Sequence, residues 1–239
     1  MRVMAFGPHP DDVEIFCSGT LAKYKSQGHD IGIAVMTRGD VGSPTLSREE
    51  IAAIREKEAR GAAAIIGAEF FWLGYDDEFL YDTPEVRRHV IDVLRQFKPD
   101  VVLCPDKDND YHPDHVRTGQ IVWDTHVMAA VPLIPTAHPA VGRIHEIWYY
   151  DTPSGIGFEP ETYVDITDVW DTKVKMAECH KSQNDWLQHL YGYPVSYLLD
   201  VQGRFRGHQC GCRYAEAFRK ARMTPQAVSR TALLPTAFG

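Results

Sequence analysis

The sequence lacks the features that would place it with membrane, nucleic-acid-binding or secreted proteins. No stretch approaches the ~20 apolar residues that a membrane-spanning helix needs. There is no basic excess, because 33 Asp and Glu outnumber 25 Lys and Arg and give a net charge of −8. We therefore expect no nucleic-acid partner. The N-terminus has no signal-peptide pattern of a basic region, an apolar region and small residues, so we expect a cytoplasmic location.

Cysteine is scarce and has no regular spacing. Five cysteines are spread over 239 residues, and an odd, scattered set does not predict a disulfide framework. No internal repeat or low-complexity linker divides the chain either. We therefore predict a single domain over residues 1–239, in which the C-terminal third adds strands and helices around the active-site crevice. At 44% hydrophobic residues the chain can build a substantial core.

Apolar runs alternate with amphipathic segments over the first half of the chain. The runs predict strands at 2–6, 31–36, 70–73 and 101–104, and the segments between and after them predict helices at 12–26, 47–66, 83–97 and 114–129. Four successive strand-helix pairs favour right-handed crossovers. The predicted fold is α/β, a Rossmann-like three-layer sandwich with a mostly parallel sheet and helices on both faces.

The C-terminal part has a weaker pattern. We predict further strands at 144–150 and 163–166, and helices at 169–182 and 214–222. The tail after Thr224 contains proline and small residues and is expected to pack loosely. An aromatic-rich patch, Trp186 with Tyr191 and Tyr193, either stacks on a ligand or packs the core or a subunit contact.

Two clusters of histidine and aspartate follow two of the predicted strands. His9-Pro10-Asp11-Asp12 comes directly after the first strand, and His112-Pro113-Asp114-His115 follows the fourth. In open parallel sheets, ligands bind beyond the carboxyl ends of the strands, where the strand order reverses. We therefore expect the two clusters to meet in one crevice. The first turn has no Gly-x-Gly-x-x-Gly, so a dinucleotide site is not predicted there.

Imidazole and carboxylate groups in this arrangement are typical of a catalytic zinc site, which uses three protein ligands and leaves one position open. His9, Asp12 and one histidine of the second cluster would complete such a set. Asp11 would then be free to accept a proton from water. Taken alone, Asp11 or Asp12 is better explained as an acidic residue at a helix N-terminus than as a catalytic group. The coincidence of two clusters favours the metal site.

Both motifs resemble the signature motifs of the PIG-L/LmbE-like zinc deacetylases, which remove an acyl group, usually acetyl, from the 2-amino position of a sugar. Weaker similarities, in chain order, extend the resemblance over most of the chain, through Thr37-Arg38-Gly39-Asp40, Arg55 with Glu58 and Ala62, Leu73-Gly74-Tyr75-Asp76-Asp77, His180-Lys181-Ser182-Gln183 and Ala215-Glu216-Ala217-Phe218. The resemblance implies one Zn²⁺ per chain and a small N-acylated amino sugar as substrate. It also makes a homo-oligomer a reasonable expectation.

Carried over by motif, the resemblance assigns roles to individual residues. The zinc ligands would be His9, Asp12 and His115. Asp11 would be the general base, and His112 would stabilise the tetrahedral intermediate or act as general acid, with Asp114 tuning it.

The resemblance also implies substrate contacts. Arg55, Asp77 and Arg38 would face the sugar, although Arg55 is equally consistent with a helix-surface pair with Glu58. His180 either braces the site or is a satisfied core histidine. Two other functions stay open: a metal-dependent amidase acting on a non-sugar N-acyl metabolite or antibiotic intermediate, and a catalytically silent sugar-binding relative.

Overall fold

The computed structural model describes residues 1–223, and its sheet has the strand order β3-β2-β1-β4-β5-β7-β6. The strands in this part of the chain are β1 (Arg2–Gly7), β2 (Asp30–Thr37), β3 (Glu69–Tyr75), β4 (Val101–Cys104), β5 (Glu146–Tyr150), β6 (Thr162–Asp165) and β7 (Ala215–Lys220). Neighbouring strands from β3 to β5 are parallel, whereas β7 is antiparallel to both β5 and β6. The predicted α/β sandwich with a mostly parallel sheet is confirmed.

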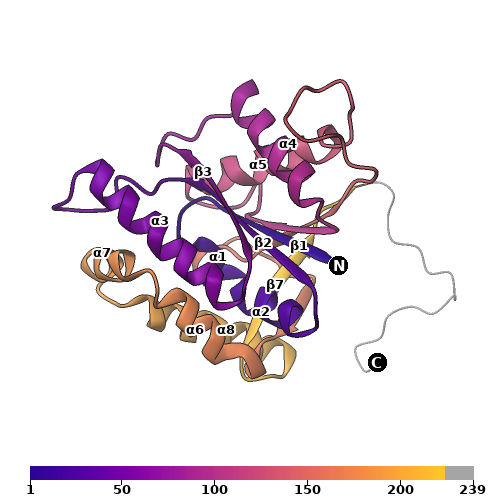
Figure 1. The fold of residues 1–239 in the computed structure, drawn as a ribbon. Helices are drawn as coiled ribbons and strands as arrows, with labels where there is room; N and C mark the ends of the chain where they lie inside the picture. Colours follow the sequence, from indigo (N-terminus) through magenta and orange to yellow (C-terminus); the bar gives the residue numbers. More distant parts are fainter. Residues whose placement is uncertain (224–239) are drawn as a thin grey trace, which may run out of the picture.

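Helices cover both faces of the sheet (Figure 1). On one face lie α4 (Pro84–Phe97) and α5 (Pro113–Met128), and on the other lie α1 (Asp12–Phe16), α2 (Ser18–Ser26), α3 (Arg48–Ile65) and α6 (Trp170–Ala177). Alternate side chains of β1 pack against the helices on opposite faces of the sheet. Met4 and Phe6 join the core under α4 and α5, whereas Val3 and Ala5 join the core with α2 and α3. A strand buried on both faces needs a continuous apolar run, which is how β1 reads in the sequence.

The position of β1 decides where a ligand site can form. It pairs in parallel with β2 on one side and with β4 on the other. The chain leaving β1 crosses toward β2, while the chain leaving β4 crosses away toward β5. The two connections diverge and leave a crevice at the carboxyl ends of β1 and β4. Both histidine motifs lie at these ends.

One predicted element of the first half needs correction in detail. The single helix expected over 12–26 is two helices, because Cys17 has an extended φ of −146° between α1 and α2. The backbone N–H groups of Gly19 and Thr20, at the start of α2, donate to the Glu216 carboxylate at 2.9 and 2.7 Å. A buried carboxylate from the far end of the chain thus satisfies donors that a continuous helix would have paired internally.

The C-terminal part departs most from the prediction. The helix predicted at 214–222 is wrong, since Ala215–Lys220 forms strand β7 between β5 and β6. The Ala and Glu residues there favour helix, but pairing on two sides overrides this weak local preference. The helix predicted at 169–182 ends at Ala177, and a separate helix, α7 (Lys181–Tyr191), follows it.

A long helix, α8 (Val195–Cys210), was missed altogether. It contains Gly203 and Gly207, which lower helix propensity. Both glycines are required by close packing: a Cβ on Gly203 would lie 2.9 Å from the Trp170 ring, and one on Gly207 would lie 2.7 Å from the Cys212 carbonyl oxygen. Helix α8 lies beside α6 and α7 (Figure 1).

Two remaining expectations concern the membrane and the C-terminus. Among the described residues, no helix has the length and apolar character needed to cross a membrane. The tail after Thr224, predicted to pack loosely, lies outside the described residues.

Candidate active site

The turn after β1 holds His9 and Asp12 against each other. Its Pro8 carbonyl oxygen accepts hydrogen bonds from the Thr37 backbone N–H and hydroxyl, both at 2.9 Å, which ties the turn to β2. Asp12 Oδ2 accepts a hydrogen bond from the His9 backbone N–H at 2.8 Å and lies 3.1 Å from His9 Nδ1. Asp11 between them has a φ of 135°, a strained value for a residue other than glycine.

The turn before α5 orients its two histidines differently. His112 is the N-cap of the helix, and its Nδ1 accepts a hydrogen bond from the Asp114 backbone N–H at 3.2 Å. The ring proton of neutral His112 is therefore on Nε2, which lies 3.3 Å from Glu78 Oε1. His115 Nδ1 lies 2.9 Å from Asp110 Oδ2, so that Nε2 is the nitrogen left for another partner.

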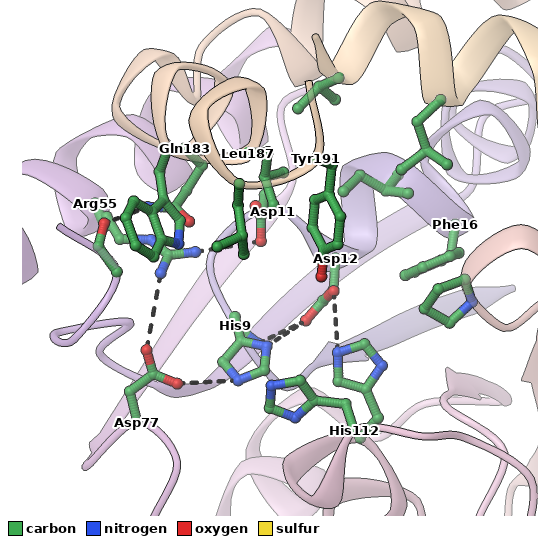
Figure 2. Close-up of a pocket in the computed structure, with 18 of the residues that line it drawn as sticks. His9, Asp11, Asp12, Phe16, Arg55, Asp77, His112, Gln183, Leu187 and Tyr191 are labelled. Atoms are coloured by element: carbon green, nitrogen blue, oxygen red, sulfur yellow. Dashed lines mark hydrogen bonds and ion pairs between the residues drawn. The ribbon is translucent and has the colours of Figure 1, made fainter. Parts of the chain in front are cut away.

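The two turns meet, as the motifs predict. The ring centres of His9 and His115 are 5.3 Å apart, and His115 Nε2 lies 3.4 Å from Asp12 Oδ1. One ligand atom each from His9, Asp12 and His115 lies within 4.8 Å of the other two. Figure 2 shows the Asp12 carboxylate beside the His9 ring, with His112 also next to His9.

These three residues fit a metal ion. All are buried, and the charges around them favour a cation: although burial lowers the pKa of His115, Asp12 and Asp110 outweigh this and raise it to about 9. A second combination, His9 with His112 and Asp114, also satisfies the distance condition. Its ligand atoms are already in use, because the Asp114 oxygens accept backbone N–H groups from Glu78 and Leu80.

Asp11 lies next to the candidate metal site, His9 with Asp12 and His115, without belonging to it. Arg55 Nη2 is 3.3 Å from Asp11 Oδ1 and donates to the Pro10 carbonyl oxygen at 2.8 Å. Burial raises the pKa of Asp11 to about 6; the Arg55 cation opposes this shift and the Asp12 carboxylate adds to it. Asp11 is thus a carboxylate whose proton affinity is close to that useful for a base at neutral pH.

The residues expected to face a sugar are divided between two places. Arg55 is buried, donates to the Gly39 carbonyl oxygen at 3.1 Å, and lies 4.0 Å from Asp77, so it is not a surface partner of Glu58. Asp77 Oδ1 is 3.0 Å from His9 Nε2. Arg55 and Asp77 line the cavity, whereas Arg38 is not among its lining residues and pairs with Asp40 and Asp76.

His180 lies behind the site. It is buried in the core layer, and its Nε2 is 3.3 Å from Glu14 Oε2, one turn along α1 from Asp11. Burial lowers the pKa of His180, but the Glu14 and Asp11 carboxylates outweigh this and raise it. The contact allows His180 to brace the helix that carries Asp11 and Asp12.

A cavity of about 370 Å³ opens above these groups, a size that suits a small organic ligand. Its polar floor comes from the two histidine turns, and much of the rest comes from α7 and α8. Trp186, Tyr191 and Tyr193, the aromatic patch of the sequence, all line it. Gln183 and Leu198 also line it and were not predicted as site residues. Gln183 ends a motif for which only His180 was given a role, and the helix that carries Leu198 has no motif.

Comparison with known proteins agrees with this geometry. Residues 4–126 match the family model described as PIG-L: GlcNAc-PI de-N-acetylase. This stretch covers half of the chain and contains both histidine turns. The chain belongs to the PIG-L family. The PIG-L match ends inside α5, so the helices that complete the cavity lie beyond it.

Individual relatives of this PIG-L protein cover more of the chain. Diacetylchitobiose deacetylase from Thermococcus kodakarensis is 30% identical over 227 residues, which is 91% of this chain and 82% of the relative. The solved structure of N,N'-diacetylchitobiose deacetylase from Pyrococcus horikoshii, with an inhibitor, is 32% identical; it has a TM-score of 0.81 and covers 94% and 86% of the two chains. A 4-oxalmesaconate hydratase from Pseudomonas putida is 26% identical over 80% of this chain and 76% of its own. The family thus includes deacetylases and at least one hydratase.

Proposed function

We propose that this protein is a zinc-dependent hydrolase that removes an acetyl or other acyl group from the amine of an N-acetylglucosamine-type sugar or conjugate. The observation that carries this proposal is the buried set His9, Asp12 and His115 with Asp11 directly beside it. Such a set has ligands for one metal and a separate base, which hydrolysis of an unreactive amide requires. The similarity to two diacetylchitobiose deacetylases supports the sugar as substrate.

The metal would be held by His9, Asp12 and His115. Two histidines and a carboxylate form a ligand set typical of catalytic zinc. When bound, zinc would supply a Lewis acid that polarises the acyl carbonyl group and makes water more acidic. Asp110 fixes the orientation of His115 from behind, as a hydrogen-bonded carboxylate commonly does for a ligating histidine.

Asp11 takes the proton of the attacking water. Its carboxylate is held by Arg55, and burial brings its pKa to about 6, so it is ionised at neutral pH yet basic enough to accept a proton. The water oxygen bonds to the carbonyl carbon, and the carbon–nitrogen bond then breaks. The proton held by Asp11 passes to the amine nitrogen as it leaves, so the free amine and the carboxylic acid are the products.

His112 stabilises the carbonyl oxygen as negative charge develops on it. Its Nδ1 accepts the Asp114 N–H, which leaves an Nε2–H to donate. Burial and the neighbouring His9 and His115 lower the pKa of His112, which favours the neutral ring. We therefore assign His112 the role of hydrogen-bond donor rather than general acid. Asp114 positions it and holds the loop before Leu80 through two backbone N–H groups.

The charges lining the cavity favour an uncharged sugar amide over a carboxylated substrate such as that of the hydratase relative. Among the described lining residues, Arg55 is the one Lys or Arg side chain, and it is already engaged by Asp11 and two carbonyl oxygens. Four carboxylates share the lining: Asp11, Asp12, Asp77 and Glu78. An organic acid anion would be repelled there unless the metal alone compensated.

The test is acetate release from N-acetylglucosamine and N,N'-diacetylchitobiose, measured on one preparation before chelation, after chelation and after zinc is restored. Activity that disappears and returns with zinc supports the proposal. Hydration of 4-oxalmesaconate, measured on the same samples, is the competing activity. If the protein binds zinc and cleaves non-sugar N-acyl compounds but no sugar, the amidase function replaces the proposed one. Zinc binding without turnover of any amide would indicate a silent relative.

A further inference from the structure

The cavity has two chemically different sides, and the candidate metal site lies between them (Figure 2). Arg55, Asp77 and Gln183 supply the polar groups of the side next to His9, where Leu187 also lies (Figure 2). The opposite side, next to His115, is apolar. The residues that line this acyl side, as we name it here, are Ile15, Phe16, Val195 and Leu198, with Tyr191 at its edge above Asp12 (Figure 2).

Phe16 forms the inner end of the acyl side and is held in place. Its ring stacks on Tyr150 with 5.5 Å between ring centres and an angle of 8° between planes. Tyr150 is anchored in turn, since its hydroxyl donates to the Phe6 carbonyl oxygen at 2.9 Å. The Phe16 ring centre is 6.3 Å from that of His115. A rigid apolar surface therefore begins next to His115.

Helix α8 continues this surface toward the rim. Val195 is buried at its start and its backbone N–H donates to Asn184 Oδ1 at 3.1 Å, which joins α8 to α7. Leu198, one turn later, contacts the same space as Ile15 and Phe16. Tyr191, at the end of α7, is 49% exposed and marks the opening to solvent. The surface is preorganised before any ligand binds, which reduces the entropy cost of binding.

The two sides match the two substituents of an amide. In a trans amide the acyl carbon and the amine substituent extend in opposite directions from the planar group. With the carbonyl carbon at the candidate metal site, sugar hydroxyl groups suit the Arg55 and Asp77 side, and the acyl group extends over Phe16. Acetyl offers a single methyl group, which covers the inner end of that surface and leaves Val195 and Leu198 without a partner.

Resting on the proposed function, we infer that the preferred substrates carry an N-acyl chain longer than acetyl, an aliphatic acyl group that lies on Phe16 and extends along α8 to Tyr191. Each methylene group moved from water to this surface contributes up to about a fourfold gain in affinity. If this gain is kept in the transition state, kcat/KM rises with chain length.

The test is a series of N-acetyl-, N-butanoyl- and N-hexanoylglucosamine, which all release glucosamine and are followed by the same primary-amine assay. We expect kcat/KM for the hexanoyl compound to exceed that for the acetyl compound by at least about tenfold. Leu198→Trp fills the acyl side and is expected to lower this ratio by about tenfold. Leu198→Asn keeps the size, removes the apolar surface and lowers the ratio as well. Val201→Trp, on the exposed face of α8 and away from the cavity, is the matched control and keeps the wild-type ratio.

Each outcome decides between the two proposals. Cleavage of the acetyl sugar with slower cleavage of both longer ones overturns the inference and leaves the proposed function intact. A rising series that Leu198→Trp and Val201→Trp change equally places the chain somewhere other than the acyl side and overturns the inference too. No cleavage of any member by the zinc-loaded protein overturns both.

Discussion

The floor of the cavity and the helices that wall it are built in opposite ways. In the floor, the contacts that orient the two histidines are short-range: Asp12 is three residues from the His9 that it fixes, and Asp110 is five residues from His115. The wall depends on contacts between distant segments, such as the buried pair of Arg206, in α8, with Asp151. Substitutions in the floor should therefore remove chemistry and leave stability largely intact, whereas substitutions in the wall supports should do the reverse.

The sharpest test of this contrast is the metal site, where we expect the largest effect. His115→Ala removes one of three ligands and should abolish stoichiometric zinc binding. The loss of several kcal/mol of transition-state stabilisation corresponds to a fall in kcat/KM of about 10³-fold or more. Zinc content by elemental analysis and turnover are measured together. His208→Ala, an exposed histidine at the end of α8, is the control and should retain both. A His115→Ala protein with full zinc content would contradict the assigned ligand set.

Asp11→Asn separates proton transfer from metal binding. The amide keeps the size of the side chain and cannot accept the proton, so we expect kcat to fall by about 10²- to 10⁴-fold while zinc content stays at the wild-type level. The free energy of unfolding should change little or rise slightly, because burial disfavours the ionised Asp11 carboxylate more than Arg55 stabilises it. Wild-type kcat in this variant would remove Asp11 as the base.

The contrast between floor and wall also explains which parts of the site could be predicted from the sequence. His9, Asp12 and one histidine of the second turn could be predicted because each turn follows an apolar strand, and adjacent parallel strands bring their carboxyl ends together. The choice of His115 over His112 came from the resemblance to the PIG-L family. The wall could not be found in this way. Residues 215–220 favour a helix locally and become β7 only through pairing with β5 and β6. Helix α8 was not predicted because Gly203 and Gly207 weaken its helical pattern. These glycines are needed because Trp170 and Cys212 pack closely against them, which only the three-dimensional structure shows.

Individual contacts of the site show the same limit. Arg38 and Arg55 both belong to stretches that resemble the family, and both were expected to face the substrate, yet only Arg55 lines the cavity. Arg38 pairs instead with the buried Asp40, two residues along the same motif, and with the exposed Asp76, which is 38 residues away. A local pattern therefore identifies groups that act within one turn. Which distant side chain neutralises a given charge depends on packing that no short motif encodes.

The wall supports give the next largest effect. Arg206 donates to Asp151 through two nitrogens, at 2.6 and 2.8 Å, and both side chains are about 3% exposed. Arg206→Ala leaves the Asp151 carboxylate buried without its partner and should lower the free energy of unfolding by about 3–5 kcal/mol, measured by urea denaturation. Arg204→Ala, two residues away in an exposed pair with Asp200, should have a much smaller effect. Equal effects of the two substitutions would contradict the contrast between floor and wall.

The smallest expected effect is a loss of stability at acidic pH that comes from His145, a buried histidine packed next to α5. His145 is buried beside His126 of α5, the helix whose first turn carries His112 and His115. Burial, with a smaller contribution from His126, lowers the pKa of His145 to about 3. Below pH ~6.5 the unfolded chain binds a proton on His145, whereas the folded chain binds it only near pH 3. The neutral His145 therefore contributes to the free energy of unfolding above pH ~6.5, and this contribution is lost as the pH falls toward 3. Between pH 7 and pH 5 the loss is about 2 kcal/mol.

His145→Gln cannot titrate, so its urea midpoint should fall less than that of the wild type over this range, whereas the exposed His189→Gln should follow the wild type. If His145→Gln and wild type lose the same stability, His145 is protonated in the fold and the floor has no acid-sensitive support there.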